Sequence, residues 1–278
     1  MTVCPKPTTA ALAHFVARHR PAVEDALNKH LPRAPEGFET DLNDAIRYAV
    51  FPGGKRIRPI LTLMGASLFG GDVGTALSSA AAVEFIHTSS VIFDDLPSMD
   101  DSPDRRGKLA LHVKHNEAIA VLAAVSFLNS SYKLVTVGIE PSKAVQMLHE
   151  TVECVGPLGM IGGQAIDLTH ATHPAMNLKT SSLIRLALRL GAVPAGATNG
   201  KLDALTEFAD LLGEAYQMSD DLIDASEDAV KNGHTPPCFD ELLVTAAEAR
   251  SVLTGHFPAC EARDALDGLV EMVVSRRS

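Results

Sequence analysis

Residues 76–101 read ALSSAAAVEFIHTSSVIFDDLPSMDD, an apolar stretch that ends in aspartates. Its apolar and small residues recur every three or four positions, which predicts a helix that ends near Asp94 and Asp95. Pro97 cannot continue that helix, because it has no N–H group and its ring clashes with the preceding turn. We therefore expect the two aspartates on the last helical turn, with Asp100 in a loop that returns towards them.

The rest of the chain shows the same helical periodicity between its glycines and prolines. No Asn-Gly turn is flanked by strand-like runs, and neither a composition shift nor a low-complexity tract suggests a linker. The sequence therefore predicts one all-α domain over residues 1–278, a bundle of ten or more helices. Helices are expected over Asp41–Val50, Ala76–Phe93, Ala118–Val137, Ser142–Val155, Thr180–Leu190, Ala204–Ile223 and Phe239–Leu253.

The composition limits the classes of function. The formal net charge of −10 argues against a general nucleic-acid binder. No apolar run reaches the roughly 18 residues needed to cross a bilayer. The first residues, MTVCPKPTTA, lack the basic and apolar segments of a signal peptide, so a cytoplasmic protein is expected. The scattered cysteines predict neither a disulfide framework nor a zinc site; they are Cys4, Cys154, Cys238 and Cys260.

A second acidic cluster, SDDLID, lies at Ser219–Asp224. Asp220 and Asp224 are four residues apart, so their carboxylates project from one face of a helix. Mg²⁺ prefers oxygen ligands and typically takes one or two carboxylates together with phosphates and water. A single DDxxD motif is more often a solvated turn, but two clusters on apolar helices predict a magnesium site.

Two basic runs accompany the acidic clusters. GGKRIRP at Gly53–Pro59 places three cations behind a glycine pair, and RRGK at Arg105–Lys108 follows the first acidic cluster. Arginine binds phosphate oxygens through two parallel hydrogen bonds, whereas lysine acts as a movable point charge. Metal ligands and cations in one site indicate phosphate-ester or diphosphate chemistry.

At these residues the chain resembles the trans-isoprenyl diphosphate synthases, especially bacterial farnesyl and geranylgeranyl diphosphate synthases. The resemblance extends from about Asp41 to Asp224 through GGKRIRP, FIHTSSVIFDDLPSMDDSPDRRGK, GMIGGQAIDL, LKTSSLIR and YQMSDDLID. It implies the isoprenoid synthase fold, with helices around a central prenyl pocket, and a homodimer. It also implies a prenyltransferase with three Mg²⁺ ions per site, which joins isopentenyl diphosphate to dimethylallyl, geranyl or farnesyl diphosphate.

The resemblance implies roles for individual residues as well. The residues that would hold isopentenyl diphosphate are Lys55, Arg58, His87 and Arg106, with Arg105 facing the allylic diphosphate. The metal ligands would be Asp94, Asp95, Asp100, Asp220 and Asp224, with Asp221 beside them in the catalytic set. The residues that would contact the allylic diphosphate and the developing cation are Lys179, Thr180 and Gln217.

The residues before the first aspartates predict the product length. Ser89 lies five positions before Asp94, where an aromatic residue in the family tends to stop growth at fifteen carbons. Because serine is small, we expect growth to twenty carbons, which makes geranylgeranyl diphosphate the product. Ser90 lies beside it, and Phe85 and Ile86 would form the next floor of the pocket.

The segment after Asp224 departs from the family pattern. His234 stands where the first of two lysines is expected, and the loop that carries the second lysine is missing. Lys231, or protonated His234, would have to compensate. Two alternatives therefore stay open: a farnesyl (C15) synthase, and a weakly active regulatory subunit of a prenyl synthase. A terpene cyclase fits less well, because it has no need for GGKRIRP and His87, and an inactive helical bundle is the remaining alternative.

Overall fold

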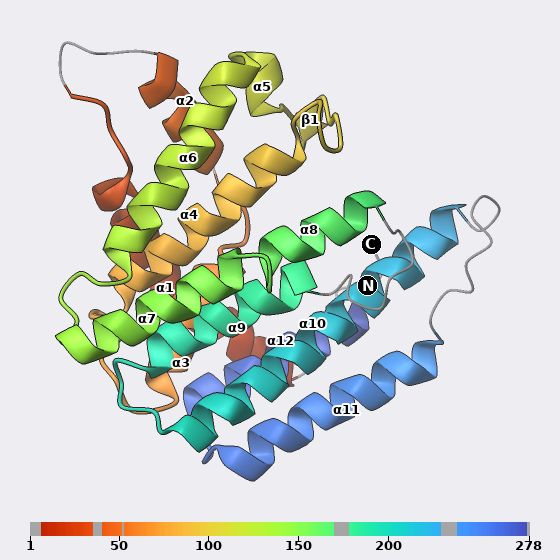
Figure 1. The fold of residues 1–278 in the computed structure, drawn as a ribbon. Coiled ribbons are helices and arrows are strands. Elements are labelled where there is room, and N and C mark those ends of the chain that lie inside the picture. Colours follow the sequence, from red (N-terminus) through yellow and green to blue (C-terminus); the bar gives the residue numbers. More distant parts are fainter. Residues whose placement is uncertain (1–6, 36–40, 52, 170–177, 229–237, 277–278) are drawn as a thin grey trace.

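The computed structural model describes residues 7–35, 41–51, 53–169, 178–228 and 238–276, and it is built almost wholly from helices (Figure 1). The predicted all-α class and the predicted number of helices are confirmed for these residues. The helices are α1 (Pro7–His30), α2 (Asp41–Val50), α3 (Ile57–Ser67), α4 (Leu77–Asp94), α5 (Leu111–Lys114), α6 (Glu117–Leu134), α7 (Pro141–Val155), α8 (Met160–Thr169), α9 (Leu178–Ala192), α10 (Asn199–Asp228), α11 (Phe239–His256) and α12 (Glu261–Ser275).

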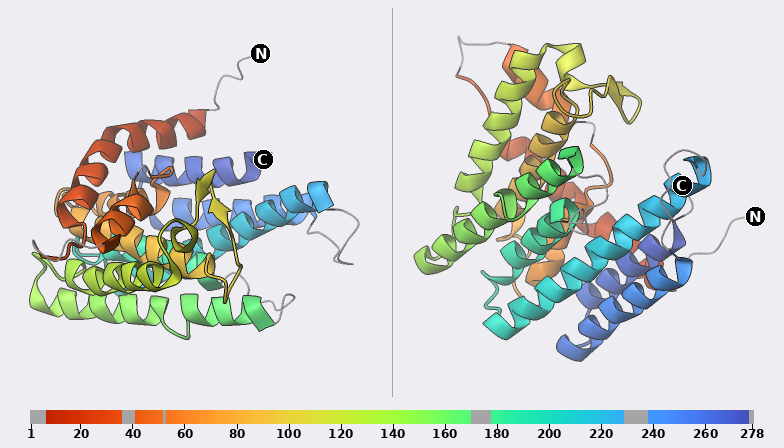
Figure 2. Two further views of the ribbon diagram at one scale, coloured as in Figure 1. Left: turned by 90° about the horizontal axis from the view of Figure 1, so that it is seen from above. Right: turned by 45° about the vertical axis from the view of Figure 1, so that its right-hand side comes forward.

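Helix α4 lies in the middle of the bundle and packs against α1, α3, α6 and α9 (Figure 1). Its small and apolar residues lie on all sides of the helix. Helix α4 is therefore buried around most of its circumference and not only along one face. Helix α1 packs against α12, which brings the first and last helices side by side (Figure 2). The carboxyl end of α4, which carries the first aspartates, is therefore held on a rigid central element.

Helices α3 and α9 approach each other backbone to backbone. A Cβ atom on Gly65 would lie 2.1 Å from the carbonyl oxygen of Leu188, and one on Gly191 would lie 1.9 Å from that of Thr62. Any larger residue at either glycine would push the two helices apart. This contact fixes the basic segment before α3 relative to the start of α9, where Lys179 lies.

Most of the predicted helices agree with the structure, and the differences have local causes. Helix α2 has the predicted bounds, α4 is shifted by one residue at each end, and α7 begins one residue earlier than predicted. Helix α6 ends at Leu134 rather than Val137, because the chain turns towards Gly138, which has a φ of +75°. The sequence interpretation omitted the remaining helices, which are α1, α3, α5, α8 and α12.

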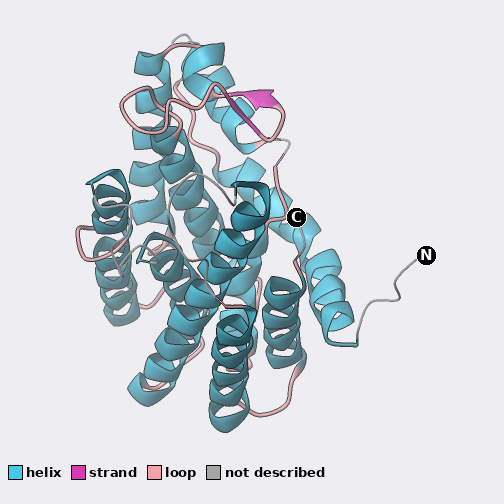
Figure 3. Cartoon of the chain, turned by 90° about the vertical axis from the view of Figure 1, so that its right-hand side faces the viewer, coloured by secondary structure: helices cyan, strands magenta, loops and turns pink. Residues whose placement is uncertain are grey.

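A short hairpin interrupts the helical structure between α4 and α5. Strand β1 (Asp104–Arg105) pairs antiparallel with β2 (Lys108–Leu109) at one end of the bundle (Figure 3). Arg106 and Gly107 form the connecting turn, with φ values of +56° and +74°. Two positive φ values match the two-residue turn that usually carries Asn-Gly. This short hairpin leaves the all-α class unchanged, and its turn contains two residues of the basic run RRGK, Arg106 and Gly107.

Among the residues that the structure describes, no helix combines the length and apolarity needed to span a bilayer.

Candidate active site

The first acidic cluster lies at the end of α4, as the sequence predicts. Asp94 is the last residue of the helix and Asp95 follows it as the cap. The loop beyond Pro97 folds back, because the backbone N–H of Asp100 donates to the carbonyl oxygen of Asp94 at 2.9 Å. The fold thus gathers three carboxyl-bearing residues around one helix end.

Protein cations bind the two aspartates at this helix end. Lys179 Nζ donates to Asp94 Oδ2 at 2.6 Å and to Gln164 Oε1 at 2.5 Å. Arg105 Nε donates to Asp95 Oδ1 at 2.6 Å. Burial raises the pKa of both carboxyls above the ordinary value, while the lysine and the arginine oppose that rise. Each carboxylate is therefore costly to keep charged without a cation beside it.

The second acidic cluster also has a protein cation. Arg276, just beyond α12, lies 2.7 Å from Asp220 Oδ1 and stacks on the ring of Tyr216 at 4.5 Å. Gln217 Nε2 donates to Asp221 Oδ1 at 2.9 Å on the exposed side of α10. The side chain of Asp224 and the whole of His234 lie outside the described residues.

The donor set fits magnesium that arrives with a phosphate ligand. Within the described residues, no group of three or more His, Cys, Asp or Glu side chains is close enough to enclose a metal ion. Three of the predicted ligands, Asp94, Asp95 and Asp220, are instead each paired with a protein cation. One or two carboxylates per ion, completed by phosphate oxygens and water, is the usual coordination of Mg²⁺.

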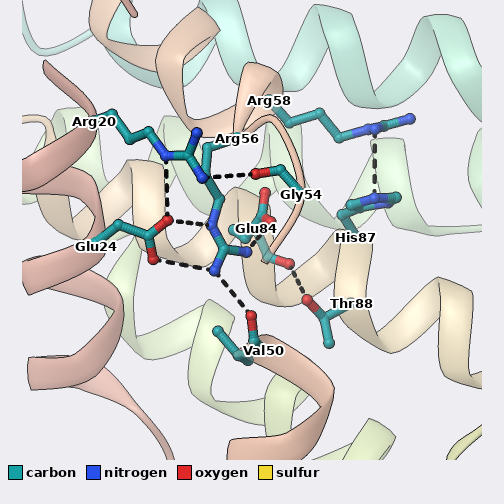
Figure 4. Close-up of polar contacts among 9 residues, drawn as sticks. All are labelled: Arg20, Glu24, Val50, Gly54, Arg56, Arg58, Glu84, His87 and Thr88. Carbon is teal, nitrogen blue, oxygen red and sulfur yellow. Dashed lines mark hydrogen bonds and ion pairs between the residues drawn. The ribbon is translucent and has the colours of Figure 1, made fainter. Parts of the chain in front are cut away.

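The basic cavity, about 440 Å³ in volume, lies between α3, α4, α9, α10 and α12. The residues of this cavity that the sequence predicted as binding residues are Lys55, Arg58, His87, Arg106 and Thr180. Arg276 lines it too, although no motif marked that residue. Arg58 Nη1 lies 3.4 Å from His87 Nε2, and the buried Nε of Arg58 has no partner (Figure 4). The cavity therefore holds cations with unused donors, which suits a diphosphate.

His87 is uncharged at neutral pH. Burial lowers its pKa well below 6.5, and the neighbouring cations, Arg58 first among them, lower it further. The ring therefore contributes a neutral N–H or a lone pair to the basic cavity rather than a charge.

The low pKa of His87 predicts a pH dependence of stability. Below pH 6.5 the unfolded chain binds a proton at this residue that the folded chain does not, so acid should destabilise the fold by up to about 1.4 kcal/mol per pH unit. His87→Gln should lessen the loss in free energy of unfolding between pH 6.5 and pH 5, measured by urea titration. His149→Gln, at an exposed position of α7, is the control. An identical pH profile in His87→Gln and the unsubstituted protein would contradict this prediction.

The apolar cavity, about 280 Å³ in volume, begins beside Asp94 and Lys179. Ile86, Ser89 and Ser90 line it from α4, as the product-length interpretation predicts. Its remaining wall comes from residues that the sequence did not single out: Phe93, Met99, Leu128, Val155, Met160, Ile161, Gln164, Ala165 and Leu168.

The α4 residues expected to form the floor of the apolar cavity are packed tightly against α6. Ser89 Oγ donates to the carbonyl oxygen of Ala124 on α6 at 2.9 Å. The ring of Phe85 packs against Phe127, with 5.3 Å between centroids, while Ile86 faces the cavity. A larger side chain at position 89 would therefore have to displace α6 or enter the cavity.

Two residues of the quoted motif GMIGGQAIDL belong to the site, although the sequence reasoning gave them no role. Gln164 accepts from Lys179, and Asp167 has a buried Oδ1 without a partner. Burial raises the pKa of Asp167. Gln164 and Asp167 are three positions apart, so both lie on one face of α8. This spacing could have identified both residues from the sequence.

Comparisons with known proteins agree with this geometry. A sequence model described as polyprenyl synthetase matches residues 39–236. A geranylgeranyl diphosphate synthase of Cyanophora paradoxa is 36% identical over 232 residues, which cover 79% of this chain and 76% of that protein. Geranylgeranyl pyrophosphate synthase 11, chloroplastic, of Arabidopsis thaliana is 34% identical over 236 residues, 80% of this chain and 65% of the plant protein. The chain thus spans less than two thirds of that plant relative.

A solved structure resembles the fold over nearly its whole length. The apo crystal structure of an FPP/GFPP synthase from Zymomonas mobilis superposes with a TM-score of 0.84 and 28% sequence identity. The alignment covers 96% of this chain and 100% of the other.

Proposed function

The chain belongs to the polyprenyl synthetase family, and we propose that it is a geranylgeranyl diphosphate synthase, which condenses isopentenyl diphosphate with an allylic diphosphate. One observation carries the proposal: Asp94 and Lys179 lie at the polar end of a cavity whose other walls come mostly from apolar side chains. A diphosphate bound between the metal-binding carboxylates and Lys179 would place its prenyl tail in that cavity. The names of the relatives support the same substrate class.

In this proposal the two acidic clusters hold three Mg²⁺ ions with the allylic diphosphate. The ligands are Asp94, Asp95, Asp100, Asp220 and Asp224, with Asp221 beside them. Magnesium stabilises the diphosphate as a leaving group, because it neutralises charge that develops when the bond to carbon breaks. Lys179 and Arg105, which lie against Asp94 and Asp95, would then turn to the diphosphate oxygens.

The basic cavity would hold the second substrate. Lys55, Arg58 and Arg106 bind the diphosphate of isopentenyl diphosphate, and neutral His87 adds a hydrogen bond. The C–O bond of the allylic substrate breaks and its electron pair leaves with the diphosphate. The double bond of isopentenyl diphosphate attacks the resulting cation, and a proton leaves the new chain for the released diphosphate. Dipoles of Thr180 and Gln217 stabilise the cation.

The proposal also includes a homodimer in the cytoplasm. Helix α6 packs one face on α4 and exposes apolar side chains on the other, at Val121, Leu122 and Val125. A row of exposed apolar residues on a helix is typical of a protein interface. Light scattering should give the mass of a dimer, and fractionation of the source cells tests the location.

The direct test is product analysis by mass spectrometry. The purified chain is incubated with Mg²⁺, isopentenyl diphosphate and one primer of five, ten or fifteen carbons in turn. We expect a twenty-carbon diphosphate from each primer that is accepted. A fifteen-carbon product would support the farnesyl synthase alternative, and no turnover with any primer would support the regulatory-subunit alternative.

Ser89→Phe should shift the product from twenty carbons to fifteen. The new ring would enter the apolar cavity, because α6 closes the other direction at Ala124. We expect the C15 product to exceed the C20 product by about tenfold, the usual discrimination by a few buried methylene groups. Ser251→Phe on α11, at an exposed position that does not line the cavity, is the control. An unchanged C20 product in Ser89→Phe would contradict the assigned floor.

A further inference from the structure

Arg56 lies between two predicted binding residues, Lys55 and Arg58, and borders the basic cavity with them, but its side chain is buried and bound by protein groups. Its guanidinium is 2% exposed. It donates to Glu24 at 3.0 and 3.1 Å, to Glu84 at 2.6 Å and to the carbonyl oxygen of Val50 at 2.8 Å (Figure 4). The partners come from α1, α4 and the end of α2, so this one side chain ties three helices to the basic segment.

The backbone at Arg56 has an unusual conformation that these contacts maintain. Its φ is +56°, in the left-handed region that a long side chain seldom adopts. Such strain persists only where the surroundings over-determine it. Helix α3 begins at the next residue and has no side-chain cap from Arg56. The backbone conformation of Arg56 therefore sets the directions in which the side chains of Lys55, before it, and Arg58, in the first turn of α3, project.

The two glycines before Lys55 make room for arginines. A Cβ atom on Gly53 would lie 1.9 Å from Cζ of Arg56, and one on Gly54 would lie 2.3 Å from Nη1 of Arg106. The guanidinium of Arg56 thus packs over one glycine, and that of Arg106 packs over the next. Arg20 binds the same loop from α1, donating to the carbonyl oxygen of Gly54 at 3.2 Å (Figure 4).

Glu84 acts on a second cation of the site as well. It lines the basic cavity together with Arg58. Burial lowers the pKa of Arg58, and the charge of Glu84 is the main effect that opposes this. One buried carboxylate therefore holds Arg56 by a hydrogen bond and stabilises the charged form of Arg58, because its charge opposes the fall in the Arg58 pKa that burial causes.

We propose that Glu84, with Arg56 and Glu24, is a positioning residue that orients Lys55 and Arg58 for the diphosphate of isopentenyl diphosphate. This inference rests on the proposed function. The diphosphate of this substrate is remote from its reacting double bond, so its contacts are the same in the ground state and the transition state. Loss of such contacts raises KM and leaves kcat nearly unchanged.

The test is Glu84→Gln, which keeps the size and an acceptor but removes the charge. We expect KM for isopentenyl diphosphate to rise about tenfold, the effect of weakening a charge-assisted hydrogen bond. KM for the allylic diphosphate and kcat should stay within about twofold of the unsubstituted protein. Calorimetric titration with isopentenyl diphosphate alone should show the same loss of affinity without any turnover.

Glu150→Gln is the matched control. Glu150 and Arg189 form a partly buried ion pair between α7 and α9, away from both cavities, with 16% of each side chain exposed. This variant should lower the melting temperature like Glu84→Gln but leave KM for isopentenyl diphosphate unchanged. Glu24→Gln, at the more exposed end of the network, should raise that KM by a smaller factor and serves if Glu84→Gln does not fold.

The outcomes separate the inference from the function on which it rests. An unchanged KM in Glu84→Gln, or an equal rise in Glu150→Gln, would overturn the positioning role while the synthase activity stands. If the unsubstituted protein neither binds nor turns over isopentenyl diphosphate, the proposed function fails and the inference fails with it.

Discussion

Asp94→Asn should lower kcat by about a thousandfold while the fold is retained. The substitution removes a carboxylate at the polar end of the apolar cavity, where in the proposed reaction magnesium would stabilise the departing diphosphate. A metal ligand of this kind contributes several kcal/mol to the transition state, and about 4 kcal/mol corresponds to a factor of a thousand. The asparagine can still accept a hydrogen bond from Lys179, so the loop should keep its position. Steady-state kinetics at saturating Mg²⁺ measures the effect.

Asp101→Asn is the control for this prediction, because it makes the same change in the same loop. Asp101 is exposed and has a φ of +47°, a conformation that asparagine adopts readily. We expect its kcat to stay within about threefold of the unsubstituted protein. Equal losses in both variants would mean that the loop, and not the Asp94 carboxylate, is what the reaction needs.

Lys179→Met should lower kcat/KM for the allylic diphosphate by about a hundredfold. In the proposed reaction Lys179 exchanges Asp94 for a diphosphate oxygen, and a hydrogen bond to a charged group is worth about 1.5–3 kcal/mol. Methionine keeps the length and apolar volume of the stem but removes the charge. KM for isopentenyl diphosphate, whose proposed site is the basic cavity, should change little. Initial rates with each substrate varied in turn separate the effect on the allylic diphosphate from the effect on isopentenyl diphosphate.

Lys143→Met provides the comparison. Lys143 is a half-buried lysine that donates to the carbonyl oxygen of Pro194, outside both cavities. It should keep nearly full kcat/KM for both substrates. If Lys179→Met behaves like Lys143→Met, Lys179 has no part in binding the allylic diphosphate.

The sequence predicted those parts of the fold that local chemistry determines. The helix over Asp41–Val50 and the end of α4 before Pro97 follow from periodicity and from the missing N–H of proline. The hairpin at Arg105–Lys108 escaped notice, because its turn uses Arg106-Gly107 instead of Asn-Gly. Helix α3 was missed as well, because it contains Pro59 and Gly65, and the sequence analysis treated prolines and glycines as boundaries between helices.

In the candidate site, too, the sequence predicted local features but not contacts between distant segments. Each motif gave the identity of its own residues, and the structure brings Lys55, Arg58, His87 and Arg106 to one cavity. The pairing of Arg56 with Glu24 and Glu84 joins residues 32 and 28 positions apart. No local spacing rule predicts such a contact, because it depends on how α1 and α4 pack around the basic segment. Arg276 was missed for the same reason, since it reaches Asp220 only through the packing of α12 on α10.

The ion pairs at Asp94, Asp95 and Asp220 also bear on the order in which ligands bind. A free metal ion must compete there with ammonium and guanidinium groups that are tethered at high effective concentration. A metal ion that arrives together with a diphosphate meets less competition, because the displaced lysine and arginines find new anionic partners on the same ligand. On the proposed function, the ligand-free protein would therefore bind the magnesium–diphosphate complex in preference to either component, and neither component alone should saturate it at the concentrations at which the complex does.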